Sequence, residues 1–173
     1  MYRKIVVLLI CIPTLSFATY CAFCDPAVIT AQEFYEDDFV AALYTHRPIF
    51  PGHCLVIPKR HVERFEELSD AEILQIGCVI KKVNIAVQKV FATQDYLLLQ
   101  KNGYSVGQTV PHVHFHYIPR KEEENSSLVF LFRMYLVNVL PPLSSSQMAP
   151  IVESLHQEML EQEEIPECSH RNW

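Results

Sequence analysis

The sequence predicts an α+β domain in which short strands pack against one long amphipathic helix. Two runs rich in β-branched and aromatic residues, 39–45 and 52–58, are separated by a turn that contains two prolines and a glycine. This arrangement indicates a β-hairpin. A helical repeat of apolar residues follows the hairpin, and two more strand-like runs follow the repeat.

Length and charge suit one compact domain that does not bind nucleic acid. The chain has 173 residues, half of them hydrophobic, and 14 Lys and Arg against 20 Asp and Glu give a net charge of −6. The chain as a whole therefore offers no electrostatic reason to bind nucleic acid. A basic segment holds Arg47, Lys59, Arg60 and Arg64. It could face an anionic small molecule, although a solvated surface is an equally simple interpretation.

The first 18 residues are typical of a cleavable signal peptide, which leaves residues 19–173 as the mature domain. Arg3 and Lys4 precede an apolar run, and Ser16-Phe17-Ala18 has the small residues of a cleavage site. We expect an exported protein, periplasmic or secreted, without stable membrane association after cleavage. The alternatives are an uncleaved membrane anchor, or a mis-assigned start and a cytoplasmic protein.

A helix is expected from Ser69 to about Phe91. Ser69 and Glu72 form a capping-box pattern, and Leu68 and Ile73 are placed for a hydrophobic staple. Apolar residues then recur at helical spacing and predict the face that packs on the sheet. They are Ile73, Ile76, Ile80, Val83, Val87 and Val90.

The remaining elements are read from short patterns. Runs 95–100 and 112–118 predict two strands joined by a glycine-containing loop. The apolar run 128–140 fits a helix or a strand equally well, because its periodicity does not separate them. A final amphipathic helix is expected from Ser146, with Pro150 tolerable only near its first turn.

The run "HVHFHYI" places three histidines at every second position. In a strand, His112, His114 and His116 would share one face, while the apolar residues between them would face the core. Imidazole suits metal ligation, and it suits attack or proton transfer near neutral pH. Same-face neighbours lie about 6.5 to 7 Å apart at Cα, so one ion could not easily take all three. We expect the middle histidine to attack and the outer two to bind or orient. The alternative is that the three histidines have no chemical role and either pack in the core or face solvent.

The loop before the histidines is suited to holding a phosphate. Gly103 and Gly107 allow close backbone approach, and Gln108 and Thr109 supply side-chain donors. The chain has no P-loop motif.

Together these residues resemble a known family. "GQTVPHVHFHYIPR" is similar to the signature of the histidine triad (HIT) family, and the resemblance extends upstream through "RPIFPGHCLVIPKRHVERFEELSDAE". It covers roughly Phe39 to Arg120 and is strongest toward the fragile-histidine-triad branch of dinucleoside polyphosphate hydrolases, with the adenosine phosphoramidase branch next.

The resemblance implies a HIT-like fold with a mainly antiparallel five-stranded sheet, a packed helix, a C-terminal helical extension and a homodimer. It implies hydrolysis or transfer at a nucleotide α-phosphate, in a dinucleoside polyphosphate or a nucleoside phosphoramidate. His114 would be the nucleophile that forms a nucleotidyl-histidine, and His116 would contact the phosphate and help protonate the leaving group. The residues expected to order the phosphate and line its site are His112, Gly107, Gln108, Thr109 and Asn102. Where this branch often has an asparagine for the ribose, the chain has Thr45 and His46.

Cys21 and Cys24 have the spacing of metal ligands, which alone fits a disulfide, a redox motif or idle thiols equally well. Some histidine triad proteins hold a structural zinc with such a pair and two histidines, whose positions match His61 and His112 here. The resemblance thus implies zinc and no organic cofactor, while a disulfide or free thiols stay open.

Three functions compete. The chain could be a nucleotidyl hydrolase or transferase, a nucleotide-binding signalling module, or an exported metal-binding protein with little turnover. The complete histidine row together with Gln108 favours the enzyme.

Overall fold

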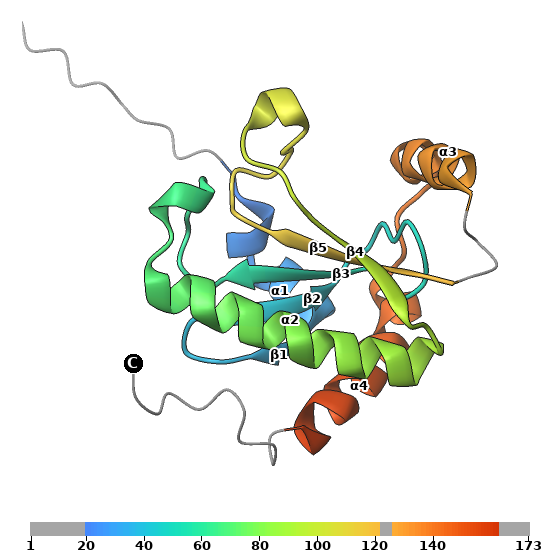
Figure 1. The fold of residues 1–173 in the computed structure, drawn as a ribbon, viewed down its shortest axis with the longest axis horizontal. Coiled ribbons are helices and arrows are strands. Elements are labelled where there is room, and N and C mark those ends of the chain that lie inside the picture. The colour runs from blue at the N-terminus through green and yellow to red at the C-terminus, as the bar shows by residue number, and fades with distance from the viewer. Residues whose placement is uncertain (1–19, 122–125, 163–173) are drawn as a thin grey trace, which may run out of the picture.

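A computed structural model describes residues 20–121 and 126–162. It contains one antiparallel five-stranded sheet in the order β1-β2-β3-β5-β4, flanked by helices (Figure 1), which confirms the predicted α+β class. The expected signal peptide, residues 1–18, lies outside the described residues. The strands are β1 (Glu33–Glu36), β2 (Val40–Tyr44), β3 (Cys54–Pro58), β4 (Asp95–Gln100) and β5 (Phe115–Arg120). The helices are α1 (Pro26–Gln32), α2 (Asp70–Phe91), α3 (Ser127–Val139) and α4 (Ser145–Glu161), with 3-10 turns η1 (Ala22–Cys24), η2 (Phe65–Glu67) and η3 (Tyr104–Val106).

One face of the sheet is covered by α2 and α4, which pack on each other and on the strands (Figure 1). Every second residue of β2 points into this core, and Tyr117 of β5 and Leu155 of α4 are completely buried there. Burying apolar side chains of this size stabilises the fold by about 1.5 to 3 kcal/mol each. This layer fixes the sheet from which the site projects.

The long helix begins where its cap predicts. The Ser69 hydroxyl accepts from the Glu72 backbone N–H, and the Glu72 carboxylate accepts from the Ser69 backbone N–H. One core assignment is wrong: Ile73 is exposed. Glu72 takes the inward position instead, because its carboxylate is buried against Arg60, which donates to both of its oxygens.

The other face of the sheet is only partly covered. Ala41, Leu43, Leu55 and Ile57 form a small cluster on it, with Phe23 and Ile29 packed against them. The turn η1 and helix α1 thus cover one part of this face. Beside them the sheet lines a cavity.

The structure corrects the prediction for one segment and decides between two predictions for another. Strand β5 begins at Phe115 and not at His112, since its ladder with β4 ends at the Gln100 and Phe115 pair. The preceding backbone bonds to a loop, with the Val113 N–H donating to the Val62 carbonyl. The apolar run 128–140 is a helix, α3. In the described ranges no helix combines the length and apolarity needed to cross a membrane.

Candidate active site and metal cluster

A cavity of about 280 Å³ opens on the partly covered face of the sheet. His114, His116 and His53 contribute to one wall, beside Lys101 and Thr109. Within the described part of the chain no carboxylate lines the cavity. The Lys101 ammonium therefore acts without a neutralising partner in the lining, which suits an anionic ligand. The other lining residues are Ala22, Phe23, Val28, Gln32, Thr45, His46, Arg47, Ile49, Leu55, Gly107, Val110, Met134, Val137 and Asn138.

His114 is held in a tautomer that suits a nucleophile. Its Nδ1 lies 2.7 Å from the His112 carbonyl oxygen. Because a carbonyl only accepts, the proton must be on Nδ1, which leaves a lone pair on Nε2. Burial lowers the pKa of His114 despite this hydrogen bond, which acts in the opposite direction. His114 is therefore a neutral imidazole with a free lone pair.

His116 is held in the opposite tautomer through a relay. The Ile49 backbone N–H donates to His53 Nδ1 at 3.2 Å, so His53 carries its proton on Nε2. That Nε2 lies 3.0 Å from His116 Nδ1 and donates to it. His116 is then left with its own proton on Nε2. Two neighbouring rings, 4.9 Å apart between centroids, thus offer the cavity a lone pair and an N–H.

The relay remains neutral well below pH 7. Burial, together with the neighbouring His116 and His114, lowers the pKa of His53 to about 3. Burial, together with His114 and Lys101, lowers the pKa of His116 to about 3. His53 follows Gly52, whose backbone has a φ of +91°. A Cβ added at this position would lie 2.9 Å from Pro119 Cγ. Only glycine fits there without strain. The tight turn thereby delivers His53 to His116.

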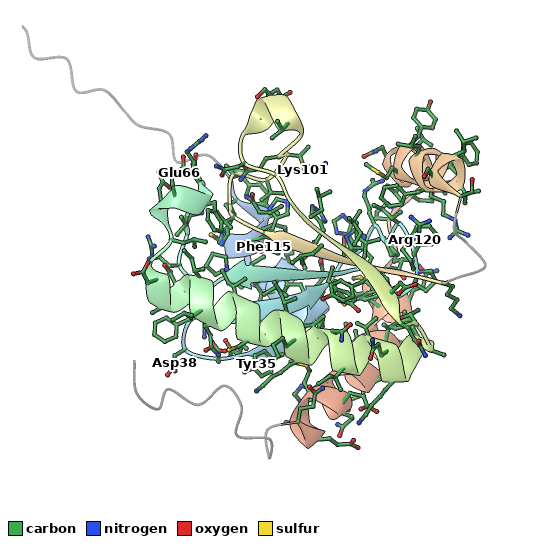
Figure 2. The ribbon with its side chains drawn as sticks, in the orientation of Figure 1. Tyr35, Asp38, Glu66, Lys101, Phe115 and Arg120 are labelled. Atoms are coloured by element: carbon green, nitrogen blue, oxygen red, sulfur yellow. The ribbon has the colours of Figure 1, made fainter. Side chains whose placement is uncertain are left out.

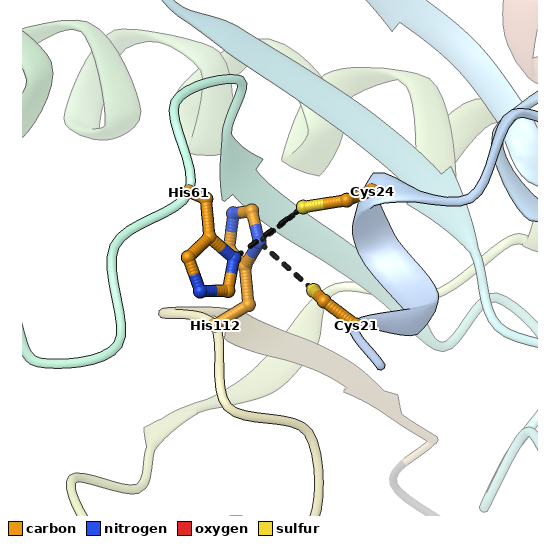
Figure 3. A group of neighbouring side chains, drawn as sticks. All are labelled: Cys21, Cys24, His61 and His112. Atoms are coloured by element: carbon orange, nitrogen blue, oxygen red, sulfur yellow. Dashed lines mark hydrogen bonds between the residues drawn. The ribbon is translucent and has the colours of Figure 1, made fainter. Parts of the chain in front are cut away.

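A second group of side chains, from three separate segments of the chain, includes the first histidine of the row (Figure 3). The ligand atoms of Cys21, Cys24, His61 and His112 all lie within 4.8 Å of one another. Three sulfur-to-nitrogen distances are 3.4, 3.4 and 3.7 Å, close to the edge of about 3.6 Å expected for a tetrahedral site with ordinary zinc bond lengths. Cys21 and Cys24 do not form a disulfide with each other. The donors and their spacing fit one tetrahedral metal ion.

His112 is oriented as a metal ligand by its other nitrogen. Its Nε2 donates to the Pro58 carbonyl at 2.8 Å, so the lone pair lies on Nδ1, which faces both sulfurs. Such a bond fixes the tautomer and ring orientation of a ligating histidine. The backbone carbonyl of the same residue orients His114. His112 therefore links the cluster to the cavity.

Phe23 makes a second link between the two sites. It lies in η1 between the two cysteines and lines the cavity. Its ring makes edge contacts with His112 and His114, at centroid distances of 5.8 and 5.3 Å. Whatever fixes the Cys21 to Cys24 turn thus also fixes one wall of the cavity.

The other predicted substrate residues are divided between two places. Gly107 and Thr109 line the cavity. Gln108 instead braces the loop, since its Oε1 accepts from the Gly103 N–H and its Nε2 donates to the Glu63 carbonyl. Asn102 lies outside the cavity lining and bonds to η2 through the Phe65 N–H and the Glu66 carboxylate. Their roles as substrate contacts stay predictions.

Three features of the site are missing from the sequence-based prediction. His53 belongs to no motif in the sequence, and its contact with His116 depends on the pairing of β3 with β5. Lys101 lies at the base of the loop that carries η3 (Figure 2) and carries no motif of its own. The third feature is the part of the lining that α3 contributes, because the sequence pattern left the secondary structure of this segment undecided.

Comparisons with known proteins agree with this geometry. The model of the HIT domain family matches residues 27–123. The asymmetrical bis(5'-nucleosyl)-tetraphosphatase of Schizosaccharomyces pombe is 40% identical over 98 residues, 57% of this chain and 54% of that protein. The chain thus spans about half the length of this relative. An adenosine 5'-monophosphoramidase of the same yeast is 38% identical over 60% of this chain and 77% of its own. A zinc-bound histidine triad family protein of Mycobacterium smegmatis shares the fold, with a TM-score of 0.63 and 20% identity over 83% of this chain and 95% of its own.

Proposed function

The chain belongs to the histidine triad family, and on that premise we propose that it hydrolyses or transfers a nucleotidyl group at the α-phosphate. The substrate would be a dinucleoside polyphosphate or a nucleoside phosphoramidate. The observation that carries this proposal is the pair of hydrogen bonds that set opposite tautomers on His114 and His116, in a cavity whose described lining contains Lys101 and no carboxylate. The similarity to a tetraphosphatase and a phosphoramidase agrees with it.

His114 would attack the α-phosphorus with its Nε2 lone pair. A P–N bond forms while the bond to the leaving group breaks, and the leaving group departs with the bonding electrons. The phosphorylated imidazole carries a positive charge, which the His112 carbonyl stabilises by accepting from Nδ1–H. Water then attacks phosphorus and loses a proton to solvent, the P–N bond breaks with its electrons returning to Nε2, the nucleoside monophosphate departs, and neutral His114 is restored.

His116 would assist both halves of the reaction through Nε2–H. This N–H hydrogen-bonds to the departing atom in the first half and to the phosphate in the second, and it stabilises negative charge there without giving up its proton. His53 keeps the proton on that nitrogen by donating to Nδ1, and the departing group takes its proton from solvent. Replacement of His116 by alanine should therefore slow substrates with poor leaving groups most. Lys101 would attract and stabilise the phosphate charge.

A substrate panel tests this proposal. Diadenosine triphosphate, diadenosine tetraphosphate and adenosine phosphoramidate are incubated with wild type and with His114→Ala, and products are separated by chromatography. AMP should appear from at least one substrate with wild type and disappear with the variant. Binding of nucleotide without AMP release would favour the signalling module.

We also propose that Cys21, Cys24, His61 and His112 hold a structural zinc. Support comes from the closeness of their ligand atoms, from three sulfur-to-nitrogen distances near those of a tetrahedral site, and from the bond between His112 and the Pro58 carbonyl. All four positions of such a site are filled by protein, so the ion would contribute to folding and not to the chemical step. It would fix the turn that carries Phe23.

A homodimer is proposed on the basis of β4. This strand ends the sheet, and Tyr96, Leu97 and Leu98 are exposed on it. An exposed apolar edge strand is a template for pairing with a second strand. Light scattering should give about twice the chain mass, and Leu97→Asp should shift it toward the monomer. Tyr104→Asp, on the exposed η3 turn, is the matched control.

A further inference from the structure

We propose that α3 forms the part of the cavity that grips the nucleoside of the transferred nucleotide. Met134, Val137 and Asn138 of this helix line the cavity that contains His114. The helix lies outside residues 27–123, the segment that matches the family model. This inference rests on the proposed function, because it concerns the substrate of that same site.

The helix is held by side-chain contacts and not by burial. None of its residues is buried. Arg47 donates from one guanidinium nitrogen to the Val137 and Leu140 carbonyls, at 2.6 and 2.8 Å. These carbonyls lie at the end of the helix, where backbone acceptors lack partners within the helix. The same residue that lines the cavity therefore anchors the end of α3.

Aromatic rings and two arginines hold the start and the middle of α3. Phe130 stacks on Phe50, with centroids 6.2 Å apart and planes inclined by 6°. The Arg133 guanidinium lies 4.5 Å from the Phe50 centroid, and that of Arg120 lies 5.1 Å from the Phe130 centroid. Arg120 is labelled below α3 in Figure 2. These contacts join α3 to the β2–β3 connection and to the end of β5.

The size of the cavity decides which part of a substrate meets α3. At about 280 Å³ it is at the small end for ligand pockets and suits one nucleotide unit better than two. His114 and α3 enclose the same space, so both should contact the unit whose phosphate His114 attacks. The leaving group would extend beyond it.

The chemistry of this wall fits a nucleoside. Met134 and Val137 offer apolar surface for a flat base, and the lining also includes the apolar Phe23 and Leu55. Asn138 donates its amide N–H to the Met134 carbonyl at 2.8 Å, which leaves its side-chain oxygen to accept. That oxygen suits an amino group of a base or a ribose hydroxyl.

The test compares residues on two sides of one helix in the full chain. Met134→Ala should weaken AMP binding about tenfold, because a half-buried thioether loses its contact with the base. Asn138→Ala should weaken it by a few fold, as for one exposed hydrogen bond. Tyr135→Ala is the matched control, since Tyr135 is 66% exposed and does not line the cavity. Its AMP dissociation constant, measured by calorimetry, should equal that of wild type.

Kinetics separate this inference from the proposed function. With adenosine phosphoramidate, Met134→Ala should raise KM while kcat stays within about twofold, because the contacts of His114 and His116 are unchanged. Equal AMP affinity in Met134→Ala and Tyr135→Ala would overturn the role of α3, even if turnover is normal. If wild type binds AMP but turns over no substrate, the proposed function fails, and the binding comparison still tests α3.

Discussion

Lowering the pH from about 7.5 to about 5.0 should reduce the free energy of unfolding by about 4 kcal/mol through His53 and His116 together. Both side chains have an ordinary pKa of 6.5, and burial lowers it to about 3 in the folded protein. At pH 5 the unfolded chain therefore binds protons at these positions and the folded chain does not. The stabilisation is complete above the ordinary pKa and is lost as the pH falls toward 3.

The magnitude follows from proton binding by the unfolded chain. For a side chain of pKa 6.5 that stays neutral when folded, the loss between these two pH values is about 2 kcal/mol. This loss of stability hardly depends on the pKa of the side chain in the folded protein as long as that pKa is below about 4. Glu66 and Glu72, whose pKa values are lowered to about 2 by Arg64 and Arg60, add little because their stabilisation is lost mainly below pH 5.

The assay is urea unfolding at a series of pH values, with extrapolation to zero denaturant. The double variant His53→Gln with His116→Gln removes both titrating groups, and metal content is kept equal. Its stability should fall by about 4 kcal/mol less than that of wild type over the same window. If the free energy of unfolding depends on pH in the same way in both proteins, the buried, neutral relay is refuted.

Two other perturbations test the parts of the site separately. Purified protein should hold about one zinc per chain. The double variant Cys21→Ser with Cys24→Ser should lose the zinc, melt at lower temperature and bind AMP more weakly because Phe23 is no longer fixed. Metal-free wild type with unchanged melting, or a Cys21–Cys24 disulfide in the mass spectrum, would contradict this. His53→Ala should lower kcat with little change in KM, most strongly for poor leaving groups, since His116 loses the donor that places its proton; an equal loss for good and poor leaving groups would exclude a positioning role.

Local patterns predicted much of the fold. The capping box at Ser69 correctly predicted the start of α2, and alternation correctly assigned Val113, which lies between two of the histidines, to the core. Strand β1 and helix α1 escaped prediction, because four and seven residues are too few for a periodicity to show. β1 also carries an irregular register between Glu33 and Tyr35.

Local sequence patterns alone predicted the site only where its residues lie together in the sequence. The histidine row and the Gly-Gln-Thr loop form one motif, and the four metal ligands came from a family resemblance. His53, Lys101 and Met134 join the site through long-range packing that no local pattern encodes. The tautomers of His114 and His116 likewise depend on partners, the His112 carbonyl and His53, that only the fold reveals.

The most direct test of the chemistry is to trap the intermediate on His114. Wild type is mixed with diadenosine triphosphate labelled at the α-phosphate, quenched within the first turnover and digested for mass spectrometry. The lone pair on His114 Nε2 predicts one nucleotidyl group, stable in base and labile in acid, on the peptide that contains His114. His114→Ala should show no label and almost no turnover. Label on another residue, or full turnover by His114→Ala, would contradict the assignment of His114 as the nucleophile.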